Sequence, residues 1–357
     1  MDKKKIIGIV IIIILIVIIA VVKLSSKSES ILGEKEKYTA TFVDVFDTTT
    51  ELTGYAYSEE EFTDMAAEIK EQLITYNNLY DIYNDYDGIN NIKTINDNAG
   101  IAPVEVDEAV IDMLKFSKEM YYETSGKTNI AMGAVLSIWH EYREAGIEDP
   151  DNATLPDLSD LQEAAAHTDI EKLIIDEEAG TVYLEDPDMS LDVGSTAKGY
   201  AAQKTMEYAK EKGMTNILLS LGGNVVGIDG RADGTDFKIG IQNPDLDSLD
   251  TYIKVVKIAD GQCVVSSGDY QRYYQVDGKV YCHIINPDTL YPADTFAQVS
   301  ILTDDSGKAD AYSTAVYNMT LEEGLDFVNS RDDIEAMWVD HAGNITYSDH
   351  FSDSIVE

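Results

Sequence analysis

Residues 191–203 combine an acid, glycines, hydroxyls and a lysine at one predicted strand-to-helix junction. Asp192 ends a short apolar run, and Ser195 and Thr196 are placed to cap the helix that follows. Unpaired N–H groups and the positive dipole at a helix start attract anions, and Lys198 adds a full positive charge in the first turn. The stretch favours a phosphate-containing, nucleotide-like ligand. An ordinary capped helix after a strand is the competing interpretation.

A second cluster of oxygen-bearing side chains lies near the start of a helix predicted over residues 307–319. Asp310, Ser313 and Thr314 are spaced i, i+3 and i+4, so the three side chains point to one side of that helix. One carboxylate with hydroxyls and phosphate oxygens suits Mg²⁺. A solvated polar helix face is the alternative, unless residues 192–198 bring the phosphate to it.

Two further stretches could take part in a site. Gly222 and Gly223 follow a predicted strand, where they either let a ligand approach the backbone or simply form a turn. His283 lies in the apolar run 280–285, and a lone strand histidine is more often a core residue than a catalyst. The chain has no Gly-x-Ser-x-Gly sequence, which excludes a hydrolase nucleophile elbow.

The N-terminus predicts a membrane anchor. Residues 6–22 are apolar residues and glycine behind a lysine-rich start, and at about 1.5 Å per residue they just cross a hydrocarbon core. Because no cleavage signal follows, we expect residues 1–27 to be an uncleaved anchor, 28–37 a polar stalk and 38–357 the catalytic domain. A basic N-terminus stays in the cytoplasm. The expectation is a single-pass cell-membrane protein with its catalytic domain on the extracytoplasmic side.

Composition narrows the possible partners. The chain has 26 basic and 66 acidic side chains and a net charge of −40. Such a surface repels nucleic acid, so no nucleic-acid partner is expected, and any anionic ligand depends on a local cation such as Lys198. Cys263 and Cys282 lie in apolar β-like runs without zinc-ligand spacing, which favours two buried thiols over one disulfide.

Periodicity and turn residues predict the elements that must position these groups. Asp-Gly turns at 260–261 and 277–278 predict antiparallel hairpins. Helices crowd the first half of the chain and strands the second without β-α-β alternation, so the predicted class is α+β: a single catalytic domain with mainly antiparallel sheet and flanking helices. The predicted helices are 58–80, 107–122, 132–145 (closed by Gly146), 158–167, 195–212, 307–319 and 321–329. The predicted strands are 38–46, 51–57, 170–176, 181–184, 216–221, 237–242, 252–259, 262–266, 270–276, 279–285 and 297–303, with a last hairpin over 334–347.

Taken together, these stretches resemble the FAD:protein FMN transferase family, the ApbE-type flavin transferases. The resemblance implies Mg²⁺-dependent transfer of FMN from FAD to a threonine hydroxyl of an acceptor flavoprotein, with release of AMP. The family pattern usually has aspartate where this sequence has Asn129 and Asn286, and glycine where it has Leu290. The matching stretches, in chain order, are Phe46 to Thr48, Tyr83, Thr124 to Asn129, Asp192 to Gly199, Leu221 to Asn224, Ser266 to Tyr270, His283 to Pro287 and Ala309 to Thr314.

The resemblance also implies roles for individual residues. His283 is the candidate base, because a threonine hydroxyl is a weak nucleophile, and its titration near neutrality would make transfer rise with pH and then level off. Phe46 and Tyr83 are expected to flank the flavin ring, and Lys198 to serve the pyrophosphate. Further expected FAD contacts are Lys127, Thr128, Asn129, Asp192, Gly222, Gly223 and Ile284, and the expected metal ligands are Ser195, Asp310, Ser313 and Thr314.

Two other functions fit the same residues. A Mg²⁺-dependent FAD pyrophosphatase would use water in place of threonine and give FMN and AMP. A surface flavin-binding protein would need no turnover at all. Lys198 together with the oxygen cluster at Asp310 favours catalysis over storage.

Overall fold

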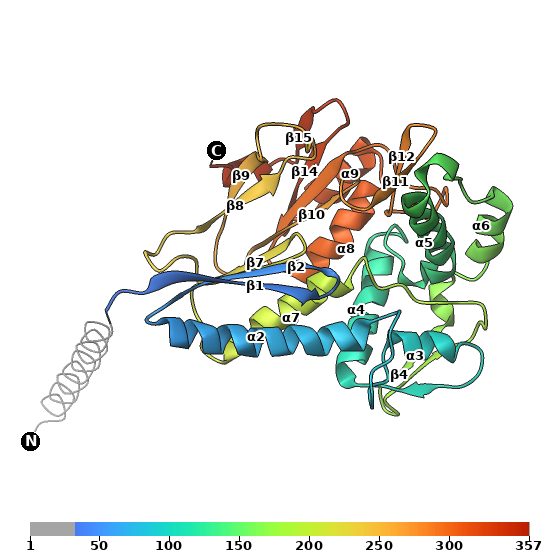
Figure 1. The fold of residues 1–357 in the computed structure, drawn as a ribbon, viewed down its shortest axis with the longest axis horizontal. Coiled ribbons are helices and arrows are strands. Elements are labelled where there is room, and N and C mark those ends of the chain that lie inside the picture. The colour runs from blue at the N-terminus through green and yellow to red at the C-terminus, as the bar shows by residue number, and fades with distance from the viewer. Residues whose placement is uncertain (1–32, 357) are drawn as a thin grey trace, which may run out of the picture.

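The computed structural model describes residues 33–356, which are organised around an 8-stranded sheet (Figure 1). Every strand pair in this sheet is antiparallel, which confirms the predicted α+β class with mainly antiparallel sheet. In spatial order its strands are β1 (Glu36–Val45), β2 (Thr48–Ala56), β6 (Ile217–Leu221), β7 (Asn224–Ile228), β10 (Cys263–Gly268), β13 (Gln298–Thr303), β14 (Ile334–Val339) and β15 (Ile345–Tyr347).

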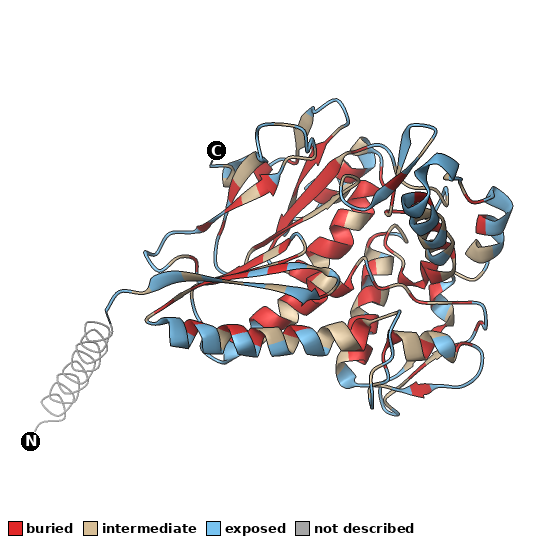
Figure 2. Ribbon diagram, in the orientation of Figure 1, coloured by how far each residue is buried: buried red, intermediate tan, exposed pale blue. Residues whose placement is uncertain are grey.

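Helices cover one face of this sheet. They are α2 (Glu59–Tyr80), α7 (Ala197–Glu211), α8 (Ser306–Tyr317) and α9 (Leu321–Asn329). The α2 helix begins where the Ser58 hydroxyl accepts the Glu61 N–H, 3.2 Å away, and its buried residues recur at helical spacing from Phe62 to Leu73. Figure 2 shows that α8 is buried along most of its length, so it forms the centre of this layer.

The opposite face is covered by the hairpin of β8 (Phe237–Gln242) and β9 (Tyr252–Ile258). Its buried residues, including Ile239 and Ile241, pack on Val264 and Leu302 of the main sheet. The hairpin predicted around residues 260–261 is therefore wrong, because β9 pairs with β8 while β10 pairs with β7 and β13. The turn instead carries the chain from one layer to the next, where the Gly261 N–H donates to the β7 carbonyl of Gly227 at 3.0 Å.

A helical lobe, residues 92–184, lies beside the sheet and shares a small core with β11 and β12 (Figure 1). The α5 helix continues through Gly146, so the predicted stop there is wrong. A Cβ at Gly146 would lie 2.5 Å from Cδ2 of Tyr274, and the glycine is needed for that close packing. The elements of this region are α3 (Ile92–Asp97), β3 (Val104–Glu105), α4 (Glu108–Glu123), η1 (Ile130–Met132), α5 (Gly133–Glu148), η2 (Pro150–Asn152), α6 (Leu158–Ala165), η3 (Ile170–Lys172), β4 (Leu173–Asp176), β5 (Thr181–Leu184), β11 (Tyr273–Val276) and β12 (Lys279–Cys282).

The predicted anchor, residues 1–27, lies outside the described residues, as does the first half of the predicted stalk. The stalk boundary at residue 37 is late, because β1 already begins at Glu36 and pairs there with Ala56. Within residues 33–356, none of the helices has the length and apolar character needed to span a bilayer. Cys263 and Cys282 are both free and buried, as favoured from the sequence.

Candidate active site

One large cleft, of about 1320 Å³, collects most of the predicted site residues. It exceeds the usual volume of a pocket for a drug-sized ligand, so it has room for a dinucleotide. Its walls come from the β1–β2 turn, the end of α2, α5, the start of α7, the β6–β7 turn and α8. The predicted residues that line it are Phe46, Tyr83, Lys127, Asn129, Asp192, Ser195, Lys198, Gly222, Gly223, His283, Ile284, Asp310 and Thr314.

The start of α7 is built differently from the sequence prediction. Its N-cap residue is Thr196, whose side chain makes no capping bond within residues 33–356 and instead contacts the Ser117 hydroxyl at 2.9 Å. The cap comes from α8, because the Asp310 carboxylate accepts the Gly199 N–H at 2.8 Å. A Cβ at Gly199 would lie 2.2 Å from the Ser306 carbonyl oxygen, so only glycine permits this approach of the two helices.

This arrangement uses up part of the predicted amide cradle for phosphate. The Val193 carbonyl accepts the N–H groups of Thr196 and Ala197, at 3.0 and 2.8 Å, and Asp310 accepts that of Gly199. Within residues 33–356 no acceptor binds the main-chain N–H groups of Ser195 and Lys198. The Lys198 ammonium lies 3.1 Å from the Gly194 carbonyl and 3.7 Å from Asp310 Oδ2. The phosphate interaction predicted here therefore rests on the Lys198 charge and on these two amides.

The oxygen cluster at α8 separates into two parts. Asp310, Thr314 and Ser195 line the cleft together, as one carboxylate with hydroxyl and main-chain oxygens, the donor set that Mg²⁺ prefers. Ser313 is fully buried, and within the described chain its hydroxyl contacts the Ser267 hydroxyl at 2.7 Å and the Asp310 carbonyl at 2.9 Å. Ser195, Asp310 and Thr314 thus fit a metal site, while Ser313 holds α8 against β10.

His283 follows β12 and is held by the main chain of Arg272. The His283 N–H donates to the Arg272 carbonyl at 3.1 Å, and Nδ1 lies 3.3 Å from the same oxygen. This contact favours the tautomer with the proton on Nδ1, which leaves the Nε2 lone pair available as a base. A proton acceptor therefore lies on the wall of the cleft that also holds Lys198.

The predicted titration of His283 near neutrality is wrong. Burial in the cleft and the positive charges of Arg272, Lys198 and Arg143 lower the pKa of His283 from 6.5 to about 3. These causes disfavour the charged imidazolium and outweigh the hydrogen bond to the Arg272 carbonyl, which favours it. The imidazole is consequently neutral across the physiological pH range.

Two aromatic side chains stand at the cleft as the resemblance implied. Phe46 occupies the β1–β2 turn at φ 52°, followed by Asp47 at φ 48°, and its N–H donates to Asn77 Oδ1 at 2.7 Å. A bulky residue rarely adopts positive φ, so this turn is strained and is held by the α2 side chain. Tyr83 is 55% exposed, with its ring centre 5.6 Å from that of His140.

The loop that precedes α5 contributes less to the cleft than predicted. Thr128 is buried and is not among the lining residues of the described chain, because its hydroxyl donates to the α8 carbonyl of Ala311 at 2.7 Å. Asn129 lines the cleft, yet its amide donates to the Thr168 carbonyl at 3.0 Å and accepts the Ala131 N–H at 2.9 Å. Lys127 forms an ion pair with Asp288. This loop therefore mainly ties the helical lobe to α8 and to the His283 segment.

Two cations that the sequence reasoning did not single out also line the cleft, Arg143 and Arg272. Arg143 Nη2 lies 2.6 Å from His140 Nδ1, and both residues line the cleft with Asp192. Burial raises the pKa of the Asp192 carboxyl, and the hydrogen bond from the Gly194 N–H and the positive charges of Lys198 and Arg143 oppose that rise. His140 and Arg143 are spaced i, i+3 on a predicted helix, and this spacing could have indicated from the sequence that the two side chains lie together.

Two of the departures from the family pattern, Asn286 and Leu290, lie in the segment that follows His283. The Asn286 amide donates to the Asn318 carbonyl at the end of α8, 3.0 Å away, and its oxygen accepts the Asp288 N–H at 2.9 Å. An ionised aspartate could not make the first of these bonds. Leu290 has φ 62°, a conformation that favours glycine, and its carbonyl accepts the Trp139 indole N–H at 2.8 Å.

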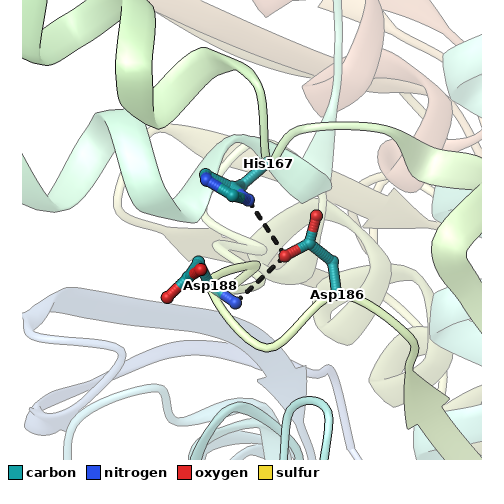
Figure 3. Close-up of side chains that lie close together, drawn as sticks. All are labelled: His167, Asp186 and Asp188. Carbon is teal, nitrogen blue, oxygen red and sulfur yellow. Dashed lines mark hydrogen bonds and ion pairs between the residues drawn. The ribbon is translucent and has the colours of Figure 1, made fainter.

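A separate group of His167, Asp186 and Asp188 has the spacing of a metal site, but its buried carboxylate, Asp186, is already bonded to protein groups (Figure 3). The Asp186 carboxylate is 2.9 Å from His167 Nδ1 and 2.6 Å from Lys172 Nζ, and it accepts the Asp188 N–H at 3.1 Å. The Lys172 ammonium is the main cause that lowers the pKa of Asp186 to about 2. These bonds occupy both carboxylate oxygens and fold the 186–188 turn.

The antiparallel sheet and a cleft with a carboxylate, a lysine and a neutral histidine define an α+β protein suited to an elongated anionic ligand. The ApbE family model matches residues 46–338, and the chain belongs to the ApbE family. It is 31% identical over 249 residues to an FAD:protein FMN transferase of Klebsiella pneumoniae, covering 70% of this chain and 74% of the relative. It is 30% identical over 264 residues to one of Treponema pallidum, covering 70% of each chain.

Solved structures agree with this assignment. The crystal structure of the ApbE protein from Thermotoga maritima matches with a TM-score of 0.78 at 26% identity, over 90% of this chain and 100% of that one. The flavin transferase ApbE from Vibrio cholerae matches with a TM-score of 0.74 at 20% identity, over 90% and 99%. At that identity the second match speaks for the fold alone.

Proposed function

We propose that this chain transfers FMN from FAD to a threonine hydroxyl of an acceptor flavoprotein and releases AMP, in a reaction that depends on Mg²⁺. The observation that carries the proposal is the meeting of Lys198, Asp310, Thr314 and His283 in one cleft, with Phe46 and Tyr83 beside it. These residues come from five separate parts of the chain. A flavin-storage protein would not require a base and a cation site in the same cleft.

The residues divide the chemistry between them. The threonine Oγ bonds to the FMN phosphorus, the bond from that phosphorus to the bridging oxygen breaks, and AMP leaves with that oxygen. His283 Nε2 accepts the hydroxyl proton, and the Lys198 ammonium orients the diphosphate. Phe46 and Tyr83 hold the planar flavin ring. Mg²⁺ held by Ser195, Asp310 and Thr314 would supply charge neutralisation on the diphosphate.

Intact-mass analysis of the acceptor tests this function directly. The purified chain is incubated with FAD, Mg²⁺ and a candidate acceptor flavoprotein, beside the same acceptor with valine in place of its target threonine. We expect only the first acceptor to gain mass, by one FMN less one water, because a phosphoester to the threonine Oγ replaces its O–H bond. Release of FMN and AMP without any mass gain would support an FAD pyrophosphatase instead, and uncleaved, tightly bound FAD would support a flavin-binding protein.

We infer from the sequence that residues 1–27 anchor the chain in the cell membrane with its catalytic domain outside the cytoplasm. The support is the uninterrupted apolar run 6–22 behind a basic start. Peptides from residues 1–27 are expected in the membrane-extracted protein, and protease added outside the cytoplasm should digest the rest of the chain. A mature N-terminus after Ala20 would overturn the anchor.

A further inference from the structure

Strand β8 has an unpaired edge that faces the cleft. It pairs with β9 on one side, and on the other side no strand within residues 33–356 bonds to it. Residues 239–242 of this strand line the cleft. Sheet edges are ready templates for another extended chain, so an open edge at this place needs an explanation.

The direction of the β8 backbone groups follows from the other side of the hairpin. The Val356 N–H donates to the Val255 carbonyl at 2.9 Å, so the polar groups of Val255 point away from β8. Gly240 is the partner of Val255 in the register. In an antiparallel pair of this kind both residues direct their N–H and C=O groups outward, and Lys238, two residues earlier, does the same. Lys238 and Gly240 therefore present hydrogen-bonding groups to the free edge.

The C-terminal end of β8 leads to the candidate base. Gln271 Nε2 donates to Gln242 Oε1 at 3.2 Å, and the next residue, Arg272, holds His283 through its carbonyl. A chain laid along β8 thus passes from Lys238 toward His283. Gln242 and Gln271 fix the spacing between the strand and the base.

Exposed apolar side chains continue this surface along the loop after β8 and into Tyr252, the first residue of β9. Leu246, Leu249 and Tyr252 are 60, 101 and 57% exposed, on a chain whose surface is otherwise strongly acidic. Such side chains add contact area for a protein partner beyond main-chain hydrogen bonds. A hydrolase that uses water as its nucleophile would have no use for this contact area.

We propose that the free edge of β8 binds an extended segment of the acceptor flavoprotein by β-strand addition and directs its target threonine to His283. The inference rests on the proposed transferase function and names how the acceptor is held. Main-chain bonding accepts many sequences, while the alternate side chains of the segment meet the cleft and the 246–252 loop. Lys238, unlike residues 239–242, is not among the described residues that line the cleft proposed for FAD.

Two substitutions of one residue test the edge. Lys238→Pro removes an N–H that faces the free edge, and proline is tolerated in such edge positions; Lys238→Ala removes the same side chain but keeps the N–H. We expect Lys238→Pro to lower kcat/KM for the acceptor by at least about fivefold relative to Lys238→Ala. FAD affinity and melting temperature should be the same in both variants. Equal kcat/KM in the two would overturn the proposal.

Amide hydrogen exchange on the unmutated full chain gives a second measurement that needs no variant. An acceptor with valine at its target position should slow exchange in peptides that contain Lys238 and Gly240. Unchanged exchange at saturating acceptor would overturn the proposal. Protection that appears without acceptor and grows with enzyme concentration would also overturn it, because a second copy of the chain would then occupy the edge. Failure of the proposed transferase function would be seen separately, because the acceptor would then gain no mass when it is incubated with the unmutated chain.

Discussion

Asp310 has two separable roles, and replacing it by asparagine and by alanine should distinguish them. Asp310 is 4% exposed, and its carboxylate accepts the Gly199 N–H at 2.8 Å and lies 3.7 Å from Lys198 Nζ. It is also the carboxylate of the proposed metal site. From the sequence we expect Asp310→Ala to abolish turnover and leave the fold intact. The capping bond changes the second half of that expectation.

The two effects have different sizes. A hydrogen bond to a charged acceptor contributes about 1.5–3 kcal/mol, and Asp310→Ala leaves the Gly199 N–H without it, so the free energy of unfolding should fall by about that amount. Asp310→Asn keeps an oxygen for that N–H and should cost less than about 1 kcal/mol. Both substitutions remove the negative charge that would neutralise the bound cation. Two unit charges 4 Å apart at an effective dielectric of 20 interact by about 4 kcal/mol, so losing this interaction in the transition state should slow FMN transfer about 10³-fold.

Thermal unfolding and single-turnover FMN transfer at limiting Mg²⁺ measure the two roles on the same samples. We expect Asp310→Ala to lose stability and transfer, and Asp310→Asn to lose transfer alone. Raising the Mg²⁺ concentration should recover part of the Asp310→Asn rate. Wild-type transfer by Asp310→Asn at limiting Mg²⁺ would remove Asp310 from the metal site, and wild-type stability of Asp310→Ala would remove its capping role.

Other predictions concern the base, the helix contact and the thiols. His283→Ala should lower transfer about 10²- to 10⁴-fold with FAD affinity near wild type. Because the lowered pKa keeps the His283 imidazole neutral above its acid titration, the wild-type pH profile should be flat from about pH 6 to 8 and fall only toward acid. A rise across pH 6–8 that His283→Ala abolishes would contradict this. Gly199→Ala should lower the free energy of unfolding by about 1–3 kcal/mol, measured by denaturant titration, since the new Cβ meets the Ser306 carbonyl; unchanged stability would refute the close contact of α7 with α8. Burial raises the pKa of both the Cys263 and Cys282 thiols, so a thiol reagent should label them only after unfolding; rapid labelling of the native chain would contradict their burial.

The sequence by itself determined the elements and much of the site. Local patterns are enough where one segment decides the outcome, as at Ser58, whose hydroxyl caps α2 at the start of the helix predicted over residues 58–80. Most of the residues that match the family pattern line one cleft because they follow strands or begin helices, positions that local turn chemistry reveals. The two buried thiols also follow from their apolar neighbours in the sequence.

Tertiary structure decided everything that depends on two distant segments meeting. The cap of α7 comes from Asp310 of α8, and local reasoning could only offer the adjacent hydroxyls of Ser195 and Thr196. The pKa of His283 is lowered by burial in the cleft and by cations that the fold brings to it from three other parts of the chain, which no spacing along the sequence encodes. The layer change after β9 is of the same kind. An Asp-Gly turn predicts a reversal of direction, but the strand that the chain then meets depends on which surface remains to be buried.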